Sequence, residues 1–163
     1  MRRALALVLL LSCASARAQS PESLRTLIAV RYPDVRWVDR ATLASWLREP
    51  TPPLLLDSRQ ESEFAVSHLR GARRIDPDHP RSDGLPRDRR LVVYCSVGWR
   101  SGSVADALRR AGFRDVFNLE GGVFGWANAG LPVHRGEREV RAVHPYDAVW
   151  GRMLRRELHA SRP

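Results

Sequence analysis

The 163-residue sequence contains no lysine and only two cysteines, Cys13 and Cys95. Cys13 lies in an N-terminal segment with the features of a cleaved leader, so Cys95 would be the only thiol of the mature chain. A single thiol excludes an internal disulfide and excludes a two-thiol redox enzyme acting alone. It also leaves Cys95 free to react or to pair with another chain.

The chain lacks the residue patterns of metal centres and of nucleic-acid binders. Its five histidines show no His-x-x-x-His spacing and no Cys-x-x-Cys pair is present, so the sequence predicts no metal site and no cofactor. All 27 basic residues are arginine, and the formal net charge is +9. The arginines are scattered instead of forming one stripe, which argues against a nucleic-acid partner, although a positive field helps to attract small anions.

The N-terminus has the residue order of a secretory signal peptide. Two arginines precede an apolar run over residues 4–11, and small residues follow, with an Ala-x-Ala site that ends at Ala18. Residues 1–18 are therefore predicted to be removed, and the chain is predicted to be exported to the periplasm or secreted. The run is shorter than the ~20 residues of a membrane span. A lipoprotein anchored through Cys13 is a minor alternative, because the preceding residues loosely resemble a lipoprotein box.

Beyond the leader, the patterns of strands and helices alternate. Residues 54–56 and 91–94 are continuous apolar runs, which is typical of parallel strands buried on both faces. Further strands are expected over residues 35–38, 71–75 and 115–119, and helices after Asp39 and over residues 61–68, 101–111 and 123–128. This alternation predicts an α/β fold with a mostly parallel central sheet flanked by helices on both faces.

The predicted organisation is one domain with a short segment on either side. The divisions are a signal peptide over residues 1–18, a helical segment over 19–34, a domain over 35–136 and a C-terminal extension over 137–163. The extension is expected to be helical because residues 147–158 have helical spacing. It can cover a sheet edge or meet a partner protein.

Cys95 follows a buried strand and precedes a helix start. Gly98, Arg100 and a Ser-Gly-Ser segment come directly after it. Backbone N–H groups at a helix start and a guanidinium both stabilise a thiolate and a bound anion, so the pattern indicates a nucleophile. The alternative is a small buried cysteine that only packs. Asp57 also ends an apolar strand, and the carboxyl ends of parallel strands share one edge of the sheet, where sites form.

Five segments of the chain resemble the rhodanese family of sulfurtransferases, across roughly residues 35–133. They are Leu54-Leu-Leu-Asp-Ser-Arg59, Glu63-Phe64, His68-Leu-Arg-Gly-Ala72, the loop that begins at Cys95, and the segment over residues 118–126. The resemblance implies a single rhodanese domain in which Cys95 carries the sulfur as nucleophile and Arg100 holds the substrate anion. A trailing His-Pro-Tyr segment at residues 144–146 is similar to that of bacterial single-domain members.

The expected site has one catalytic residue, Cys95, and a loop that binds the substrate. The loop residues are Ser96, Val97, Gly98, Trp99, Arg100 and Ser101. Asp57 and Arg59 are expected to support the site as an ion pair that braces the sheet edge. Trp99 can either pack the loop down or form an apolar wall at the mouth of the pocket.

The loop spacing favours sulfur chemistry over phosphate chemistry. Arg100 stands five residues after Cys95, whereas cysteine phosphatases place their arginine six residues after the nucleophile, where this chain has Ser101. The predicted function is transfer of a sulfane sulfur from thiosulfate or a persulfide to a thiol acceptor, through a Cys95 persulfide. Arg100 is the only cation of the loop, so a persulfide donor fits as well as thiosulfate. The alternative function is a sulfur carrier or docking module for an exported partner protein, without turnover.

Overall fold

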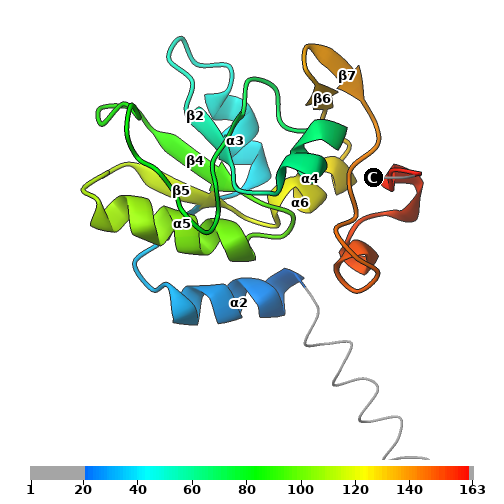
Figure 1. The fold of residues 1–163 in the computed structure, drawn as a ribbon, viewed down its shortest axis with the longest axis horizontal. Coiled ribbons are helices and arrows are strands. Elements are labelled where there is room, and N and C mark those ends of the chain that lie inside the picture. The colour runs from blue at the N-terminus through cyan, green and yellow to red at the C-terminus, as the bar shows by residue number, and fades with distance from the viewer. Residues whose placement is uncertain (1–20, 162–163) are drawn as a thin grey trace, which may run out of the picture.

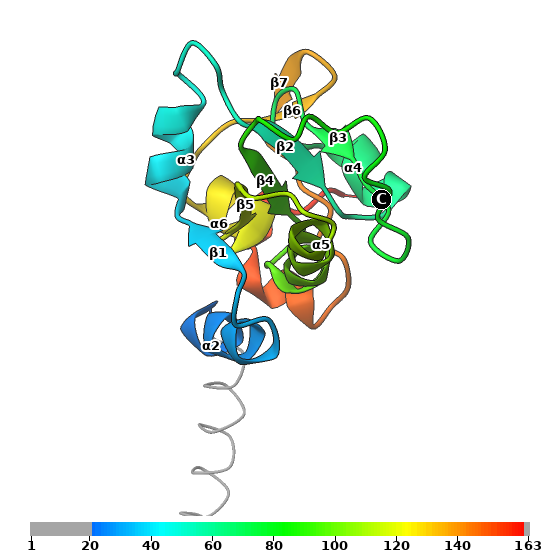
Figure 2. The ribbon, with the colours of Figure 1, turned by 90° about the vertical axis from the view of Figure 1, so that its left-hand side faces the viewer.

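The computed structural model describes residues 21–161, and the predicted signal peptide with Cys13 lies outside them. Within the described residues, five parallel strands form the central sheet in the order β1-β5-β4-β2-β3 (Figure 1 and Figure 2). The strands are β1 (Arg36–Val38), β2 (Leu54–Asp57), β3 (Arg73–Arg74), β4 (Leu91–Tyr94) and β5 (Val116–Leu119). The predicted α/β class with a parallel central sheet is confirmed.

The three central strands β2, β4 and β5 are buried at every position. Their side chains alternate between the two faces of the sheet, since neighbouring residues of a strand point in opposite directions. Leu55 and Val92 belong to one core, and Leu56 and Val93 belong to the other. The continuous apolar runs of the sequence therefore serve two cores at once.

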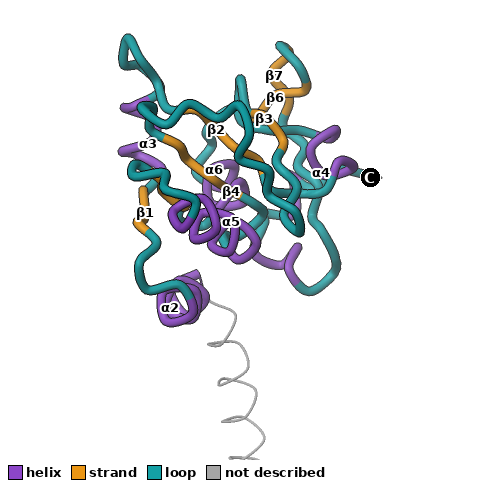
Figure 3. The backbone as a smooth tube through the Cα atoms, turned by 60° about the vertical axis from the view of Figure 1, so that its left-hand side comes forward, coloured by secondary structure: helices purple, strands orange, loops and turns teal. Residues whose placement is uncertain are grey.

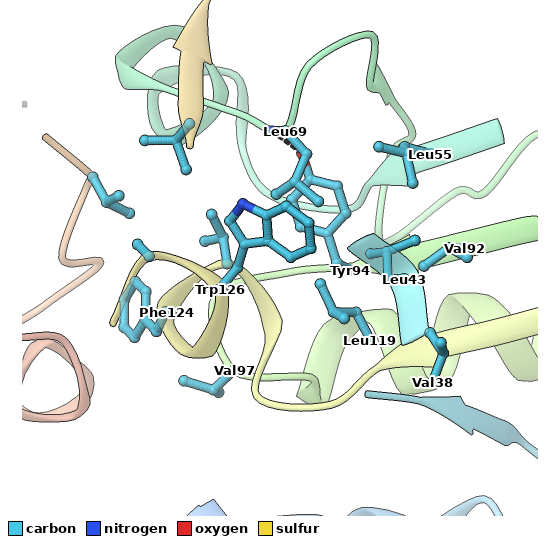
Figure 4. Close-up of a cluster of buried hydrophobic side chains, with 14 of the residues drawn as sticks. Val38, Leu43, Leu55, Leu69, Val92, Tyr94, Val97, Leu119, Phe124 and Trp126 are labelled. Carbon is cyan, nitrogen blue, oxygen red and sulfur yellow. Dashed lines mark hydrogen bonds between the residues drawn. The ribbon is translucent and has the colours of Figure 1, made fainter. Parts of the chain in front are cut away.

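Helices cover both faces of the sheet (Figure 2). α3 (Arg40–Trp46) and α6 (Gly122–Asn128) contribute to the first core, and α5 (Trp99–Arg110) contributes to the second. Trp126 of α6 lies at the centre of the first core, close to Tyr94 and Leu69 (Figure 4). The Tyr94 hydroxyl accepts a hydrogen bond from the Leu69 amide at 3.0 Å.

Helix starts agree with the sequence in one case and differ in another. The Asp39 carboxylate accepts hydrogen bonds from the amides of Ala41 and Thr42, so the predicted cap of α3 is confirmed. α5 begins at Trp99, two residues earlier than predicted. Gly98 precedes it with a φ of +107°, a left-handed conformation that glycine adopts without a steric penalty.

Two further helices complete the N-terminal part. α2 (Pro21–Arg31) packs against α5, and α4 (Glu61–Val66) connects β2 to β3. The loop between β3 and β4 has neither helix nor strand, as expected (Figure 3). No helix among the described residues is long and apolar enough to cross a membrane.

The C-terminal part differs from the prediction. β6 (Val133–Arg135) and β7 (Arg138–Val140) form an antiparallel hairpin that crosses the expected domain boundary at residues 136–137. The helix expected over residues 147–158 is not formed. In its place are two single-turn 3₁₀ helices, η1 (Trp150–Met153) and η2 (Arg156–Leu158).

The C-terminal chain forms two separate turns that pack on the core. The Asp147 side chain accepts hydrogen bonds from the Val149 and Trp150 amides, so it caps the turn that leads into η1. The backbone leaves the helical conformation at Leu154 and Arg155, between the two turns, and Leu154 and Leu158 are both buried in the first core. The extension is therefore packed into the domain.

Candidate functional site

The site lies where two central strands end. Asp57 is the last residue of β2, and Cys95 follows Tyr94, the last residue of β4. Asp57 and Tyr94 are paired in the parallel register of the two strands. Asp57 and Cys95 thus lie at one edge of the sheet, where sites of open α/β sheets form.

The Cys95 sulfur is buried and receives a backbone hydrogen bond. The Gly98 amide donates to the Cys95 Sγ at 3.2 Å, and the side chain of Asn118 donates to the Gly98 carbonyl at 2.9 Å. Cys95 itself is 1% exposed. The loop thus places an N–H group on the sulfur, which stabilises negative charge there.

The start of α6 holds the same loop from the other side. The amides of Val123 and Phe124 donate to the carbonyl oxygens of Cys95 and Ser96, at 2.9 and 3.0 Å. Two orphan amides of a helix start thereby fix the loop backbone. The segment over residues 118–126, which carried part of the resemblance, therefore supports the loop.

Arg100 forms a two-pronged ion pair with Glu63. Its Nη1 and Nη2 donate to the two carboxylate oxygens at 2.6 and 2.8 Å, and Nη2 also donates to the Ser96 hydroxyl at 3.0 Å. Ser96 in turn donates to Glu63 at 3.1 Å. The sequence interpretation gave Arg100 to the thiolate and the substrate anion, whereas the structure turns its planar fork toward a carboxylate of the protein.

The pKa values of the pair follow from this contact. Burial alone would lower the pKa of Arg100, but hydrogen bonds to Glu63 and attraction to Cys95 and Glu63 outweigh it and raise that pKa. Burial alone would raise the pKa of Glu63, but the hydrogen bonds and charge of Arg100, with the Gln60 amide, hold it below its ordinary value. The two groups are therefore both charged at neutral pH.

A small cavity lies beside Cys95. Its volume is about 90 Å³. It is lined by Cys95, Ser96, Val97, Trp99, Arg100, Tyr146 and Trp150. The last two residues come from the C-terminal extension, and the Arg100 guanidinium stands 4.9 Å from the centre of the Tyr146 ring, within cation–π distance.

The predicted loop residues take different places around this cavity. Trp99 is 44% exposed and lines the cavity, which matches the second of its two expected positions, the apolar wall. Gly98 contacts the sulfur through its amide only. Ser101 does not line the cavity, because it lies in the first turn of α5 with its hydroxyl buried in the interior.

Asp57 and Arg59 form the expected ion pair, and both are fully buried. Arg59 Nη2 donates to Asp57 at 2.6 Å and to the Ser67 carbonyl at 2.6 Å. The pair therefore ties the end of β2 to the end of α4. Neither residue lines the cavity, so the geometry matches the bracing arrangement expected from the sequence.

Sequence reasoning did not assign a site position to Glu63, Tyr146 or Trp150. Glu63 was noticed only as part of the resemblance, and its place three residues after Gln60 also suits a capping box at a helix start. Tyr146 and Trp150 were read as parts of a trailing segment and a helix. The available signal for Glu63 was an acidic residue within the resemblance that could pair with Arg100, the arginine of the loop.

Comparisons with known proteins give the class of the chain. A model of the Rhodanese-like domain family matches residues 39–129, which is more than half of the sequence, and the chain belongs to this family. A sulfurtransferase of Allochromatium vinosum is 34% identical over 102 residues, which cover 61% of this chain and 94% of that protein. Family and relative support sulfur transfer as the general chemistry.

A second relative and a solved structure extend the comparison. The probable adenylyltransferase/sulfurtransferase MoeZ of Mycobacterium tuberculosis is 36% identical over 94 residues, covering 55% of this chain. The chain matches only 24% of the length of MoeZ. The crystal structure of the Alr3790 protein from Anabaena has 30% identity and a TM-score of 0.54, and the match covers 60% of this chain and 81% of that one.

Proposed function

We propose that this chain is a sulfurtransferase that moves a sulfane sulfur from thiosulfate or a persulfide to a thiol acceptor, with Cys95 as carrier. The observation that supports this most directly is the position of Cys95, which lines a cavity and whose sulfur accepts a hydrogen bond from the Gly98 amide. A reactive cysteine needs both access and a stabilised thiolate.

In the first half of the proposed reaction, the Cys95 thiolate attacks the outer sulfur of the donor. With thiosulfate, a new S–S bond forms at Cys95, the S–S bond of the donor breaks, and sulfite leaves with the electron pair. The Gly98 amide stabilises the charge on the Cys95 sulfur as the bond forms. No metal or cofactor takes part in this proposal.

In the second half, an acceptor thiolate attacks the outer sulfur of the Cys95 persulfide. The acceptor becomes a persulfide and the Cys95 thiolate is restored. Cyanide can serve as the acceptor in an assay, and thiocyanate is then the product. Through both halves, Arg100 and Glu63 hold Ser96 and with it the loop backbone.

Turnover with simple donors tests the proposal. Wild-type protein with thiosulfate or a small persulfide, and cyanide as acceptor, is expected to form thiocyanate over many cycles, and Cys95→Ser is expected to form none. Loading of Cys95 without repeated cycles would support the carrier or docking alternative. Transfer by Cys95→Ser at the wild-type rate would contradict the proposal.

We also propose that the protein is exported, on the basis of the sequence order of residues 1–18, which lie outside the described residues. The mature chain is expected to begin at Gln19. N-terminal sequencing of protein from fractionated cells tests this, and an intact Met1 in the cytoplasm or a lipid on Cys13 would contradict it.

A further inference from the structure

The cavity above Cys95 carries little free positive charge. Arg100 is the only charged side chain among the residues that line it, and both carboxylate oxygens of Glu63 already contact Arg100. Glu63 is 2% exposed, so water screens this pair weakly. When Cys95 is ionised, the group of three charges is negative overall, and a doubly charged donor enters against that charge.

The size of the cavity limits what it can enclose. At about 90 Å³ it is much smaller than the ~300–1,000 Å³ of pockets that enclose a drug-sized ligand. It can hold the transferred sulfur and the few atoms next to it. The remainder of a larger donor must lie at the mouth of the cavity.

The mouth is aromatic. Trp99 from α5 and Tyr146 from the C-terminal extension line the cavity and are 44% and 46% exposed, so both side chains also face solvent. Trp150 lies beside them in the lining. Together Trp99, Tyr146 and Trp150 form what we call the aromatic rim.

A hydrogen bond and a cation–π contact hold Tyr146 of the aromatic rim in a strained backbone conformation. Tyr146 has a φ of +68°, the only non-glycine residue of the described chain with a positive φ, and this conformation costs about 1–2 kcal/mol. Its amide donates to the His144 Nδ1 at 2.9 Å, and its ring packs on the Arg100 guanidinium. Residues in strained conformations of this kind persist only where the surrounding structure holds them, and they cluster at functional sites.

From these observations we propose that the sulfur donor is a small organic persulfide with an apolar or aromatic group beside its sulfur, and with no more than one negative charge. The aromatic rim holds that group while the cavity holds the sulfane sulfur. This inference rests on the proposed sulfurtransferase function and names its substrate class.

The step balances without any further reactant. The Cys95 thiolate attacks the outer sulfur of R–S–SH, the new bond gives Cys95–S–SH, and the old S–S bond breaks so that R–S⁻ leaves with its electron pair. One negative charge is present before and after the step. A thiosulfate donor instead brings two charges into the cavity and leaves sulfite, which has no group for the rim to hold.

Three donors separate the effect of the donor's charge from the effect of its apolar group. They are thiosulfate, methyl persulfide and benzyl persulfide, each with cyanide as acceptor. For wild-type protein, kcat/KM is expected to be about tenfold higher for benzyl than for methyl persulfide, the effect of covering part of one ring. Thiosulfate is expected to be the poorest donor of the three.

Variants on two elements test the rim. Tyr146→Ala and Trp99→Ala are each expected to lower the benzyl-to-methyl ratio of kcat/KM toward one, and Tyr146→Phe is expected to keep it. Val149→Ala is the matched control, because Val149 is exposed on the same segment but does not line the cavity. Glu63→Gln is expected to raise the thiosulfate-to-methyl ratio severalfold, since it removes the charge that neutralises Arg100.

The outcomes distinguish a failure of the proposed sulfurtransferase function from a failure of the donor assignment. Absence of transfer from all three donors would overturn the proposed function. Transfer in which thiosulfate is the best donor, or in which the benzyl-to-methyl ratio is near one in the wild type and in the variants, would overturn the donor assignment alone. Ratios are insensitive to the fraction of folded protein, so a partly destabilised variant still gives an answer.

Discussion

The Cα of Gly122 lies directly against the carbonyl oxygen of Cys95. A Cβ at position 122 would stand 2.4 Å from that oxygen and 2.6 Å from the Ser96 carbonyl oxygen. Both neighbours are backbone atoms of the loop, so neither can move without moving the sulfur. The first residue of α6 thus sets how closely that helix approaches the nucleophile.

Gly122→Ala is therefore expected to displace the Cys95 loop and to lower sulfur transfer by at least tenfold. Gly130→Ala is the matched control, because Gly130 also has a positive φ but a Cβ there meets nothing within 4 Å. Both variants carry the left-handed penalty of about 1–2 kcal/mol, so the difference between them isolates the contact with Cys95. Thermal unfolding and kcat/KM measure it, and equal values for the two variants would contradict the account.

The pairing of Glu63 with Arg100 predicts an acid-dependent stability. The pKa of Glu63 is held below its ordinary value of 4.5, so the carboxylate stabilises the fold above that value and this contribution is lost as the pH falls through the lowered pKa. At pH 7, Glu63→Gln is expected to lower the free energy of unfolding by about 2 kcal/mol, the scale of charged hydrogen bonds.

The difference in free energy between wild type and Glu63→Gln should shrink as the pH falls below 4.5 and through the lowered pKa of Glu63, where Glu63 itself becomes protonated. Urea denaturation at a series of pH values measures this difference. A difference that stayed constant from pH 7 to pH 3 would show that the charge of Glu63 contributes nothing to stability.

Arg100→Lys tests whether Arg100 clamps the donor or positions the loop. Lysine keeps the charge but loses the planar fork that contacts both oxygens of Glu63 and the Ser96 hydroxyl. Because the fork is used on the protein, we expect kcat to fall by about tenfold for thiosulfate and for methyl persulfide alike, with little change in KM.

Arg110→Lys, on the exposed side of the same helix, is the control for this experiment. It is expected to leave both parameters as in the wild type. A selective rise of KM for thiosulfate in Arg100→Lys would instead show that Arg100 holds the donor anion, as the sequence alone suggested.

Asp57 and Arg59 are expected to act on stability and not on chemistry. Removing one partner of a buried ion pair leaves the other charge without compensation and costs about 3–5 kcal/mol, so Asp57→Asn should be strongly destabilised. The double variant Asp57→Asn, Arg59→Met should recover part of that loss. Chemical denaturation compares the three proteins, and a double variant less stable than Asp57→Asn would contradict this bracing role.

The sequence was sufficient for the sheet and for the position of the nucleophile. The runs that precede Asp57 and Cys95 are continuous and apolar, a pattern typical of strands buried on both faces, and the structure has β2 and β4 there. The Ala-x-Ala site at Ala18 predicts a cleaved leader, and that prediction stands untested because it lies outside the described residues.

The environment of the nucleophile could not be derived in the same way. Glu63 meets Arg100 across 37 positions of sequence. Trp150 reaches the cavity from a segment whose spacing predicted a helix, and Tyr146 reaches it from the position just before that segment. These contacts depend on how the C-terminal chain packs into the first core, through residues such as Leu158. Helical spacing reports local preference only, and the backbone leaves the helical conformation at Leu154.

The measurement closest to the central claim is the intact mass of the purified protein after treatment with a sulfur donor. The account predicts that wild-type protein gains the mass of one sulfur atom from methyl persulfide and that a reductant removes it. If the purified chain still carries residues 1–18, its Cys13→Ser variant is expected to gain the sulfur too. Cys95→Ser is expected to gain none. A stable, reductant-sensitive sulfur on Cys95→Ser, or an unchanged mass for folded wild-type protein with every donor, would contradict the assignment of Cys95 as the sulfur carrier.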